Sequence, residues 1–362
     1  MLDKLEAARE MDDELEGEQS PFYIAAAGSP SRPRCILKQN DCFAVLDNHG
    51  AIGCARDEAG GLFARDTRHL SRLDFLIDGQ EPLLLGSTLR DDNLNLRADL
   101  TNPDILAGEG IELLKDTVHI GRTIYIHNGL LCERSALINH GNVPVSLDVT
   151  IDFESDFADL FEVRGMRRPA RGSVQKEVVG RNKVILRYTG VDNKVRETAL
   201  TFEPEPTELK TTSARYALTL PPSVPWRQFI TVSCDGQARP AAPSFLRGLL
   251  QARRDLVGNP HDFVSIETSN AVVNEIVCRS LADLRMLMTT TPEGKYPYAG
   301  IPWYSTTFGR DGLITAMQTL WFDASIARGV LQRLGHFQAE AIDEASDAQP
   351  GKILHEMRSG EM

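Results

Sequence analysis

The sequence predicts a multi-domain β + α protein, in which an antiparallel β-sandwich is followed by the first part of a helical domain. Between residues 35 and 236, short runs of alternating apolar and polar residues are separated by turn-forming clusters, and no helical pattern intervenes. Beyond residue 243, apolar residues recur at helical spacing. At 362 residues the chain is also long enough for two domains.

Residues 1–34 form a predicted acidic tail. Residues 1–20 contain eight acidic and two basic side chains, which account for half of the formal net charge of −12. We expect this segment to be solvated and disordered, with an interaction segment as the alternative. The rest of the chain is mildly acidic and has no basic stripe, which argues against nucleic acid and against an anionic membrane as partners.

The predicted sandwich domain, residues 35–236, contains eight β-type runs. They are Phe43–Leu46, Ser71–Ile77, Thr117–Ile126, Leu130–Ile138, Val145–Phe153, Lys183–Tyr188, Arg215–Leu220 and Arg227–Cys234. In Val145–Phe153 the odd-numbered positions are apolar and the even-numbered positions are polar. This alternation is typical of a strand with one buried face. Turn clusters such as Asp47–Gly50 and Asn139–Asn142 separate the runs.

Residues 237–243, rich in proline and alanine, are predicted to be a linker. Beyond them, Ser269 and Asn270 can cap a helix with an apolar face that extends from Val272 to Leu287. A second helix is expected after Asp311 and a third from about Ala324 to Ile342. The last residues, Pro350–Met362, are predicted to be a loop that does not close any structural unit. Apolar helix faces and long polar loops suit a larger helical domain, so we expect residues 244–362 to be the truncated N-terminal part of one.

The segment Gly300–Gly312 combines three aromatic side chains, several hydroxyl groups and the pair Arg310–Asp311, directly before an apolar helical run. Aromatic faces contact the C–H surface of a sugar ring, and fixed donors and acceptors bind its hydroxyls. A helix N-terminus favours the carboxylate of Asp311 at this position. The segment therefore predicts sugar chemistry.

The remaining composition indicates a cytoplasmic protein that needs no cofactor. The six cysteines show no C-x-x-C spacing and mostly lie in apolar stretches such as Ile276–Cys278, so we expect reduced, buried thiols. No apolar run has the length of a membrane span, and an acidic N-terminus is unlike a signal peptide. The eight histidines are scattered and no glycine-rich phosphate loop occurs, so we expect no metal and no nucleotide.

Two groups of motifs resemble the bacterial glycogen-debranching-enzyme-like, or amylo-α-1,6-glucosidase-like, family. In the first half they are Phe43–Gly50, Phe63–Ser71 and Ser155–Gly165. In the second half they are Gly300–Tyr304, Phe308–Asp311 and Gly351–Arg358. The resemblance covers nearly all of the chain from about residue 35, and it implies that the helical part is the beginning of an (α/α)6 six-hairpin glycosidase barrel.

In related (α/α)6 glycosidases, an Arg-Asp pair that follows an aromatic residue helps to hold the non-reducing sugar in the cleavage subsite. The resemblance therefore implies that Arg310 and Asp311 bind substrate, with Trp303 and Tyr304 as walls of the subsite. The chemistry agrees, because a carboxylate accepts hydroxyl protons and a guanidinium donates to hydroxyls. The alternative is an Arg-Asp capping pair at a helix start, preceded by core aromatics.

His355, Glu356 and Arg358 form a second polar cluster that the resemblance implies near the pocket; the alternative is a solvated loop end. Two charged motifs of the first half, Arg65–Arg68 and the set Asp156, Asp159, Glu162 and Arg164, have two interpretations. They can form ion pairs between strands or between domains, or one of the loops can reach the rim of the sugar pocket.

Glycoside hydrolysis mostly uses two carboxyl groups, about 6.5–9.5 Å apart in inverting enzymes. The resemblance implies that the general acid and the general base lie beyond residue 362. We therefore expect a fragment of a hydrolase of α-glucosidic bonds in an oligosaccharide or α-glucan, which by itself is inactive and in which Asp311 holds sugar without cleaving it. The alternatives are a non-catalytic carbohydrate-binding or scaffolding protein, and a hydrolase of another small glycoside such as mannosylglycerate or trehalose.

Overall fold

Antiparallel strand pairing dominates the computed structural model, which describes residues 33–53, 59–107, 110–236, 245–257, 266–344 and 346–362. Residues 33–362 form one unit. The predicted linker at 237–243 and all but the last two residues of the predicted tail at 1–34 lie outside the described residues. Cys54 lies outside them as well.

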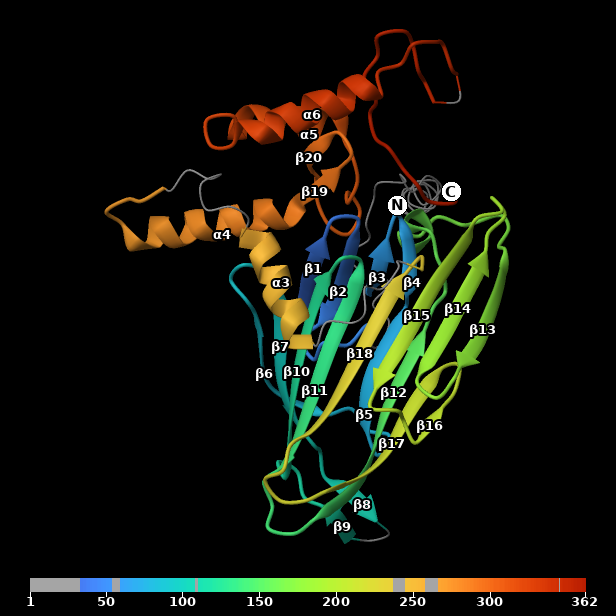
Figure 1. The fold of residues 1–362 in the computed structure, drawn as a ribbon, viewed down its shortest axis with the longest axis vertical. Coiled ribbons are helices and arrows are strands. Elements are labelled where there is room, and N and C mark those ends of the chain that lie inside the picture. The colour runs from blue at the N-terminus through green and yellow to red at the C-terminus, as the bar shows by residue number, and fades with distance from the viewer. Residues whose placement is uncertain (1–32, 54–58, 108–109, 237–244, 258–265, 345) are drawn as a thin grey trace, which may run out of the picture. The chain divides into compact units, whose positions relative to one another are not determined.

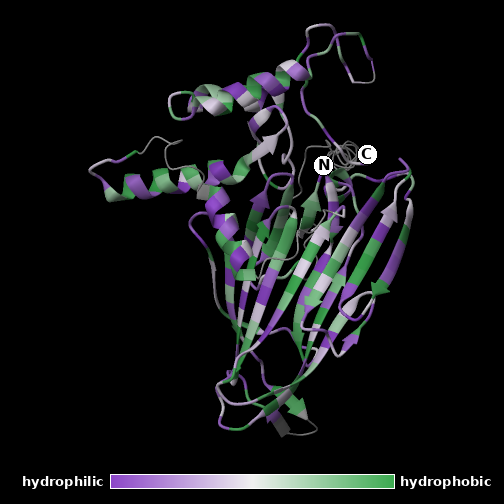
Figure 2. Ribbon diagram, in the orientation of Figure 1, coloured by the Kyte–Doolittle hydropathy of each residue, from purple (hydrophilic) through white to green (hydrophobic). Residues whose placement is uncertain are grey.

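One layer of the sandwich is an eight-stranded antiparallel sheet (Figure 1). Its strands, in spatial order, are β13 (Ser173–Val179), β14 (Lys183–Thr189), β15 (Val195–Glu203), β18 (Trp226–Cys234), β11 (Leu130–Asn139), β10 (Val118–His127), β7 (Asn95–Thr101) and β6 (Leu83–Leu89). Most of these strands alternate hydrophobic and hydrophilic residues (Figure 2). The strands from β14 to β7 therefore offer one apolar face to the core, whereas β13 is exposed along its whole length.

A four-stranded sheet supplies the facing layer. Its strands are β16 (Glu208–Leu209), β17 (Ser213–Leu220), β12 (Val145–Glu154) and β5 (Arg72–Ile77). The predicted alternation in β12 is confirmed, because its apolar side chains are buried and the intervening ones are more exposed. Rings meet between the two layers: Phe153 lies 5.6 Å from Phe202, and Tyr216 lies 5.2 Å from Trp226. The core of the sandwich lies between these sheets.

A second four-stranded sheet contains most of two of the three first-half motifs, Phe43–Gly50 and Phe63–Ser71. It consists of β1 (Arg34–Gln39), β2 (Cys42–Asp47), β3 (Gly61–Ala64) and β4 (Thr67–Leu70). The turn between β3 and β4 places Arg65 and Asp66 at positive φ, 49° and 61°. A small hairpin, β8 (Ile105–Ala107) with β9 (Gly110–Leu113), completes the described strands of the sandwich.

All eight predicted β-type runs are confirmed as strands, with ends that differ by one or two residues. Other strands were missed, among them β7 and β15, in which charged residues lie between only a few apolar ones. The expectation of no helix within the sandwich was wrong. Residues Leu160–Val163 form a short helix, α2, because the Asp159 side chain accepts a hydrogen bond from Phe161 N and starts the turn.

The helical half begins with α3 (Phe245–Val257), which the sequence analysis missed. The predicted helix after Asn270 is confirmed as α4 (Ala271–Leu287), with Asn270 Oδ1 accepting from Val272 N at 2.9 Å. A hairpin of β19 (Met288–Thr291) and β20 (Gly294–Pro297) follows. Then come α5 (Gly309–Thr319) and α6 (Ala324–His336).

The third predicted helix ends six residues earlier than expected. Phe337 is the C-cap of α6, and the following chain turns away because Ala339 N donates to Lys352 O at 2.9 Å. The apolar face of α4 is also less covered than its pattern predicts, with Val272 and Ile276 about three-fifths exposed and Cys278 exposed rather than buried. The described helices do not by themselves establish a six-hairpin barrel, which stays a prediction.

The last residues were expected to close nothing, and this was wrong. They run back to the sandwich, where Ser359, Glu361 and Met362 donate backbone hydrogen bonds to carboxylates of the β3–β4 turn and of α2 (Figure 1). The physical reason is that two buried carboxylates need donors. Among the described residues, no helix has the length and apolar character needed to cross a membrane.

Candidate functional site

The predicted aromatic walls lie in the loop between β20 and α5. Backbone hydrogen bonds between Gly300 and Tyr304 close a tight turn in this loop. Trp303 is half-buried because it packs on an apolar cluster of the sandwich side that includes Phe43, Phe63 and Leu160. The sandwich therefore holds Trp303 in place.

Tyr304 is more exposed than Trp303, with 43% of the residue accessible. Its ring lies 5.7 Å from the ring of Phe308, and the guanidinium of Arg164 lies 5.8 Å from its centroid. Arg164 comes from the end of α2, so one of the charged sandwich motifs reaches this loop. Contacts from two sides leave part of the Tyr304 ring face open to a ligand.

Arg310 and Asp311 occupy the first turn of α5. Their side chains are 77% and 42% exposed, and Arg310 Nε lies 4.0 Å from Asp311 Oδ2. The helix N-cap is Phe308, which makes no side-chain capping hydrogen bond. Asp311 is therefore not the N-cap of α5, although its carboxylate lies where the helix dipole favours negative charge.

The second predicted cluster lies directly beside the start of α5. Gly309 N donates to His355 O at 3.0 Å, and Met357 N donates to Thr307 O at 3.1 Å. Phe308 and Glu356 form an antiparallel bridge between these bonds. The structure thus brings together two motifs that lie more than 40 residues apart in the sequence. The ring of His355, itself exposed, lies 6.0 Å from the ring of Phe308.

Arg358 is largely enclosed, with 13% of its side chain exposed. Its guanidinium donates to Asp66 Oδ1 at 3.1 Å and to Trp303 O at 3.0 Å. It also bonds Glu356 Oε2 at 3.0 Å. Because these acceptors already surround it, Arg358 fits the positioning of Trp303 and Glu356 better than direct contact with a ligand.

Asp66 is the sandwich residue that accepts most from the helical half. Besides Arg358, its carboxylate accepts from Ser359 N at 2.8 Å. Burial raises the pKa of Asp66, while the bond from Ser359 and the charge of Arg358 oppose that rise. The Arg65–Arg68 motif had two interpretations. Asp66 forms an ion pair with Arg358 of the helical half, which agrees with the first of them, ion pairing between domains.

Two further supports of the site were missed. Arg333 on α6 donates to Thr307 Oγ1 at 2.8 Å and to Glu293 Oε2 at 2.7 Å. Buried Tyr296 on β20 donates to Phe308 O at 2.8 Å, and burial raises its pKa to about 12. These side chains differ from surface residues only in being buried. Their neighbours in the sequence do not indicate that burial, so the sequence could not reveal their role.

A possible metal cluster lies elsewhere. Asp47, His49 and Glu81 each place one ligand atom within 4.8 Å of the others. Asp47 Oδ1, however, accepts from His49 N and Ala51 N, both at 2.9 Å, as the cap of a turn. Turn stabilisation accounts for this arrangement.

Residues 37–231 match the model of a protein family described as the N-terminal domain of (some) glycogen debranching enzymes. The chain belongs to this family. The resemblance indicated by the first-half motifs is therefore confirmed, and the matched range coincides with the sandwich. A comparison with curated proteins finds no match to the sequence.

Several solved structures are similar in fold. A kojibiose phosphorylase candidate from the human microbiome aligns with a TM-score of 0.50 at 8% identity, over 83% of this chain and 46% of its own. A bacterial glucoamylase complexed with acarbose aligns with a TM-score of 0.45 at 11% identity, over 85% and 51%. A family 92 glycosyl hydrolase aligns with a TM-score of 0.45 at 12% identity, over 91% and 50%. The chain spans about half the length of these structures, and such low identities concern the fold alone.

Proposed function

We propose that this chain is the carbohydrate-holding part of a glycoside hydrolase of the amylo-α-1,6-glucosidase type, which acts on α-glucosidic bonds in an oligosaccharide or α-glucan. The main support is the start of α5. There the side chains of Arg310 and Asp311 are accessible, and the partly exposed ring of Tyr304 packs on Phe308, the N-cap residue of the same helix. Membership in a family named for glycogen debranching enzymes supports the substrate class.

The proposed binding mode follows from these groups. Asp311 accepts hydrogen bonds from two sugar hydroxyls, and Arg310 donates to a third. The exposed face of Tyr304 covers the C–H side of the ring. His355 and Glu356 lie on the strand-like segment next to the helix start and complete the polar rim.

We further propose that this chain binds sugar without cleaving it. The carboxyl groups near the start of α5 have other roles: Glu356 is bonded to Arg358, and Asp66 and Asp159 are buried acceptors of backbone N–H groups. Asp311 on the first helical turn suits a hydroxyl acceptor. Hydrolysis needs a general acid and a second carboxylate on either side of the bond.

Isothermal titration with maltooligosaccharides tests the binding claim. We expect Asp311→Ala to weaken binding about tenfold or more, because a charge-assisted hydrogen-bond acceptor is worth roughly 1.5–3 kcal/mol. Glu275→Ala is the matched control, since it removes an exposed carboxylate near the start of α4. Equal affinity of the wild type and Asp311→Ala would contradict the proposed site.

A glucose-release assay with panose and limit dextrin tests the absence of cleavage. We expect no release from this chain, and clear turnover would refute that part of the proposal. Including trehalose and mannosylglycerate in the titration tests the substrate class. Tight binding of either one with no binding of maltooligosaccharides would replace the α-glucan by another small glycoside.

We also propose the cytoplasm as the compartment. The described cysteines carry thiols rather than disulfides, although two of them, Cys42 and Cys234, lie close together in the sandwich core. The hydrogen bond with the neighbouring Cys42 and burial raise the pKa of the Cys234 thiol, which keeps it protonated and unreactive. Reduced neighbouring thiols are typical of a reducing compartment.

A further inference from the structure

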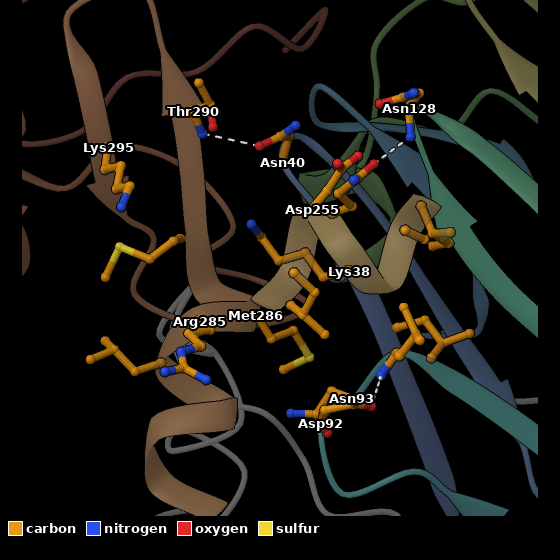
Figure 3. Close-up of a pocket in the computed structure, with 18 of the residues that line it drawn as sticks. Lys38, Asn40, Asp92, Asn93, Asn128, Asp255, Arg285, Met286, Thr290 and Lys295 are labelled. Atoms are coloured by element: carbon orange, nitrogen blue, oxygen red, sulfur yellow. Dashed lines mark hydrogen bonds between the residues drawn. The ribbon is translucent and has the colours of Figure 1, made fainter. Parts of the chain in front are cut away.

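The sandwich and the helical half enclose a cavity of about 480 Å³ (Figure 3). Its walls come from β1, the β6–β7 turn, the β10–β11 turn, α3, the end of α4, the β19–β20 hairpin and the start of α6. This volume lies within the range of about 300–1,000 Å³ that is usual for small-molecule sites. None of the seven residues predicted to bind sugar lines it.

The charges in the wall of the cavity are balanced. Three basic and three acidic side chains line it: Lys38, Arg285, Lys295, Asp92, Asp255 and Asp323. An anion or a cation in this space meets like charges as well as opposite ones, so neither gains much. A neutral ligand meets no repulsion from like charges.

Amide groups add donors and acceptors around the cavity. Asn40, Asn93 and Asn128 lie at three different points of its wall (Figure 3), and an amide can both donate and accept. The Asn93 amide already donates to Asp283 Oδ1 at 2.7 Å and accepts from Arg279 at 2.8 Å, which leaves it one N–H for a ligand. Asn40 Oδ1 accepts from Thr290 N at 3.0 Å, which holds this side chain between β1 and β19. A ligand with several hydroxyl groups matches such a mixed set.

Lys38 extends from β1 into the cavity (Figure 3). Its Nζ donates to Thr289 Oγ1 at 2.8 Å and lies 4.9 Å from the centroid of the Tyr298 ring. Burial lowers the pKa of Lys38 to about 7, which the neighbouring Asp41 partly opposes. Near neutral pH the amine can therefore act as a donor or as an acceptor toward a hydroxyl group.

Apart from Gln39 and Thr290, the rest of the wall is apolar and includes Ile126, Leu284, Met286, Met288 and Phe322. Such a surface suits the C–H faces of a sugar ring. A purely apolar ligand is disfavoured, because it would displace water from charged and amide groups of the wall and offer them no hydrogen bonds in return.

We propose that this cavity is a second binding site, separate from the start of α5, for a neutral polyhydroxylated ligand with the size of a mono- or disaccharide. The proposal does not depend on the Arg310–Asp311 site. Because the walls come from both halves of the chain, an occupied cavity also holds the sandwich and the helices together.

The first experiment tests whether maltose binds in the cavity by measuring how maltose changes the rate at which the Lys38 amine is methylated. The Asp311→Ala variant is treated with formaldehyde and cyanoborohydride at pH 7, with and without maltose, and methylation of each lysine is measured by peptide mass spectrometry. We expect maltose to slow the methylation of Lys38 several-fold and to leave the exposed Lys210 unchanged. Unchanged methylation of Lys38 at saturating maltose and glucose would overturn the proposal.

The second experiment separates the two sites by titration. Met286→Trp fills the cavity, so we expect it to abolish maltose binding there. Binding at the start of α5, which Asp311→Ala removes, should remain. Met317→Trp on the exposed face of α5 is the control for the added indole. If Asp311→Ala alone abolishes all binding, the cavity site is wrong; if Met286→Trp alone does so, the α5 site is wrong.

Glucose 6-phosphate serves as the charged probe in the same titration. We expect it to bind in the cavity at least about tenfold more weakly than glucose, because the wall provides no net positive charge for the phosphate. Equal or tighter binding of glucose 6-phosphate would refute a site for neutral ligands. If Met286→Trp does not fold, the Lys38 experiment still decides the question.

Discussion

His69 shows how far a single residue can depend on its surroundings. It is fully buried on β4, with Nδ1 3.1 Å from Thr198 Oγ1 and Nε2 3.6 Å from Asp235 Oδ2. Burial lowers the pKa of His69 to about 4, while Asp235 opposes and Arg196 and Arg65 add to the shift. The folded protein therefore keeps His69 neutral at physiological pH.

We predict that His69 makes the protein less stable in mild acid. Between about pH 6.5 and 4 the unfolded chain binds a proton that the folded one does not, so the free energy of unfolding falls as the pH is lowered through this range. The loss is about 3 kcal/mol at most. Urea titrations from pH 7 to 4 measure it, and His69→Gln should remove this part of the slope. An unchanged slope in His69→Gln would contradict the assignment.

At the scale of elements, α5 is held by close backbone packing. A Cβ at Gly312 would lie 2.3 Å from Tyr296 Oη and 2.6 Å from Tyr296 Cζ, and Tyr296 itself is buried and bonded to Phe308 O. Only glycine therefore lets the helix start sit against β20. A Cβ at Gly335 on α6, by contrast, would meet no atom within 4 Å.

These two glycines predict opposite effects of the same substitution. Gly312→Ala should destabilise the protein by about 1–3 kcal/mol, as overpacking of a core does. Gly335→Ala should stabilise it by roughly 0.5–1 kcal/mol, since alanine is the better helix former. Urea unfolding of both variants measures the difference. Tyr296→Phe should not rescue Gly312→Ala, because the ring carbon also clashes; a full rescue would show that only the hydroxyl matters.

For the whole molecule, the family motifs are where the two halves of the chain meet. Asp66 binds Arg358 and Ser359, and Asp159 accepts from Glu361 N at 2.8 Å. Glu361 in turn bonds Arg168 at 2.6 Å and Tyr188 at 2.8 Å. The segment that carries His355 and Glu356 is thus fastened on one side to α5 and on the other to the sandwich.

We predict that Asp66 and Arg358 are energetically coupled. Removing one partner leaves the other charge poorly paired and enclosed, so Asp66→Ala and Arg358→Ala should each destabilise the protein by about 2–4 kcal/mol. The double variant should cost less than their sum by roughly 0.5–3 kcal/mol. Urea unfolding of the four proteins measures this cycle. Strict additivity would mean that the contact contributes nothing as a pair. Asp66→Asn, which keeps an acceptor for Ser359 N, is the milder control.

Local patterns were enough to find much of the fold. The alternation in β12, the turn clusters and the Asn270 cap depend on neighbouring residues, because period and capping are properties of one element. The order of the motifs identified the family for the same reason, since each motif is a short local run. The helix that was predicted to reach Ile342 shows the limit: its end depends on Lys352, a residue that the local pattern does not include.

The candidate site depends on contacts that no short pattern contains. Arg358 and Asp66 lie 292 residues apart, and Lys38 and Thr289 lie 251 residues apart. The cavity, the enclosure of Arg358 and the support from Arg333 arise only when strands and helices pack. The physical reason is that hydrogen bonding and alternation select each element locally, whereas burial and charge pairing between elements are set by which surfaces exclude water together.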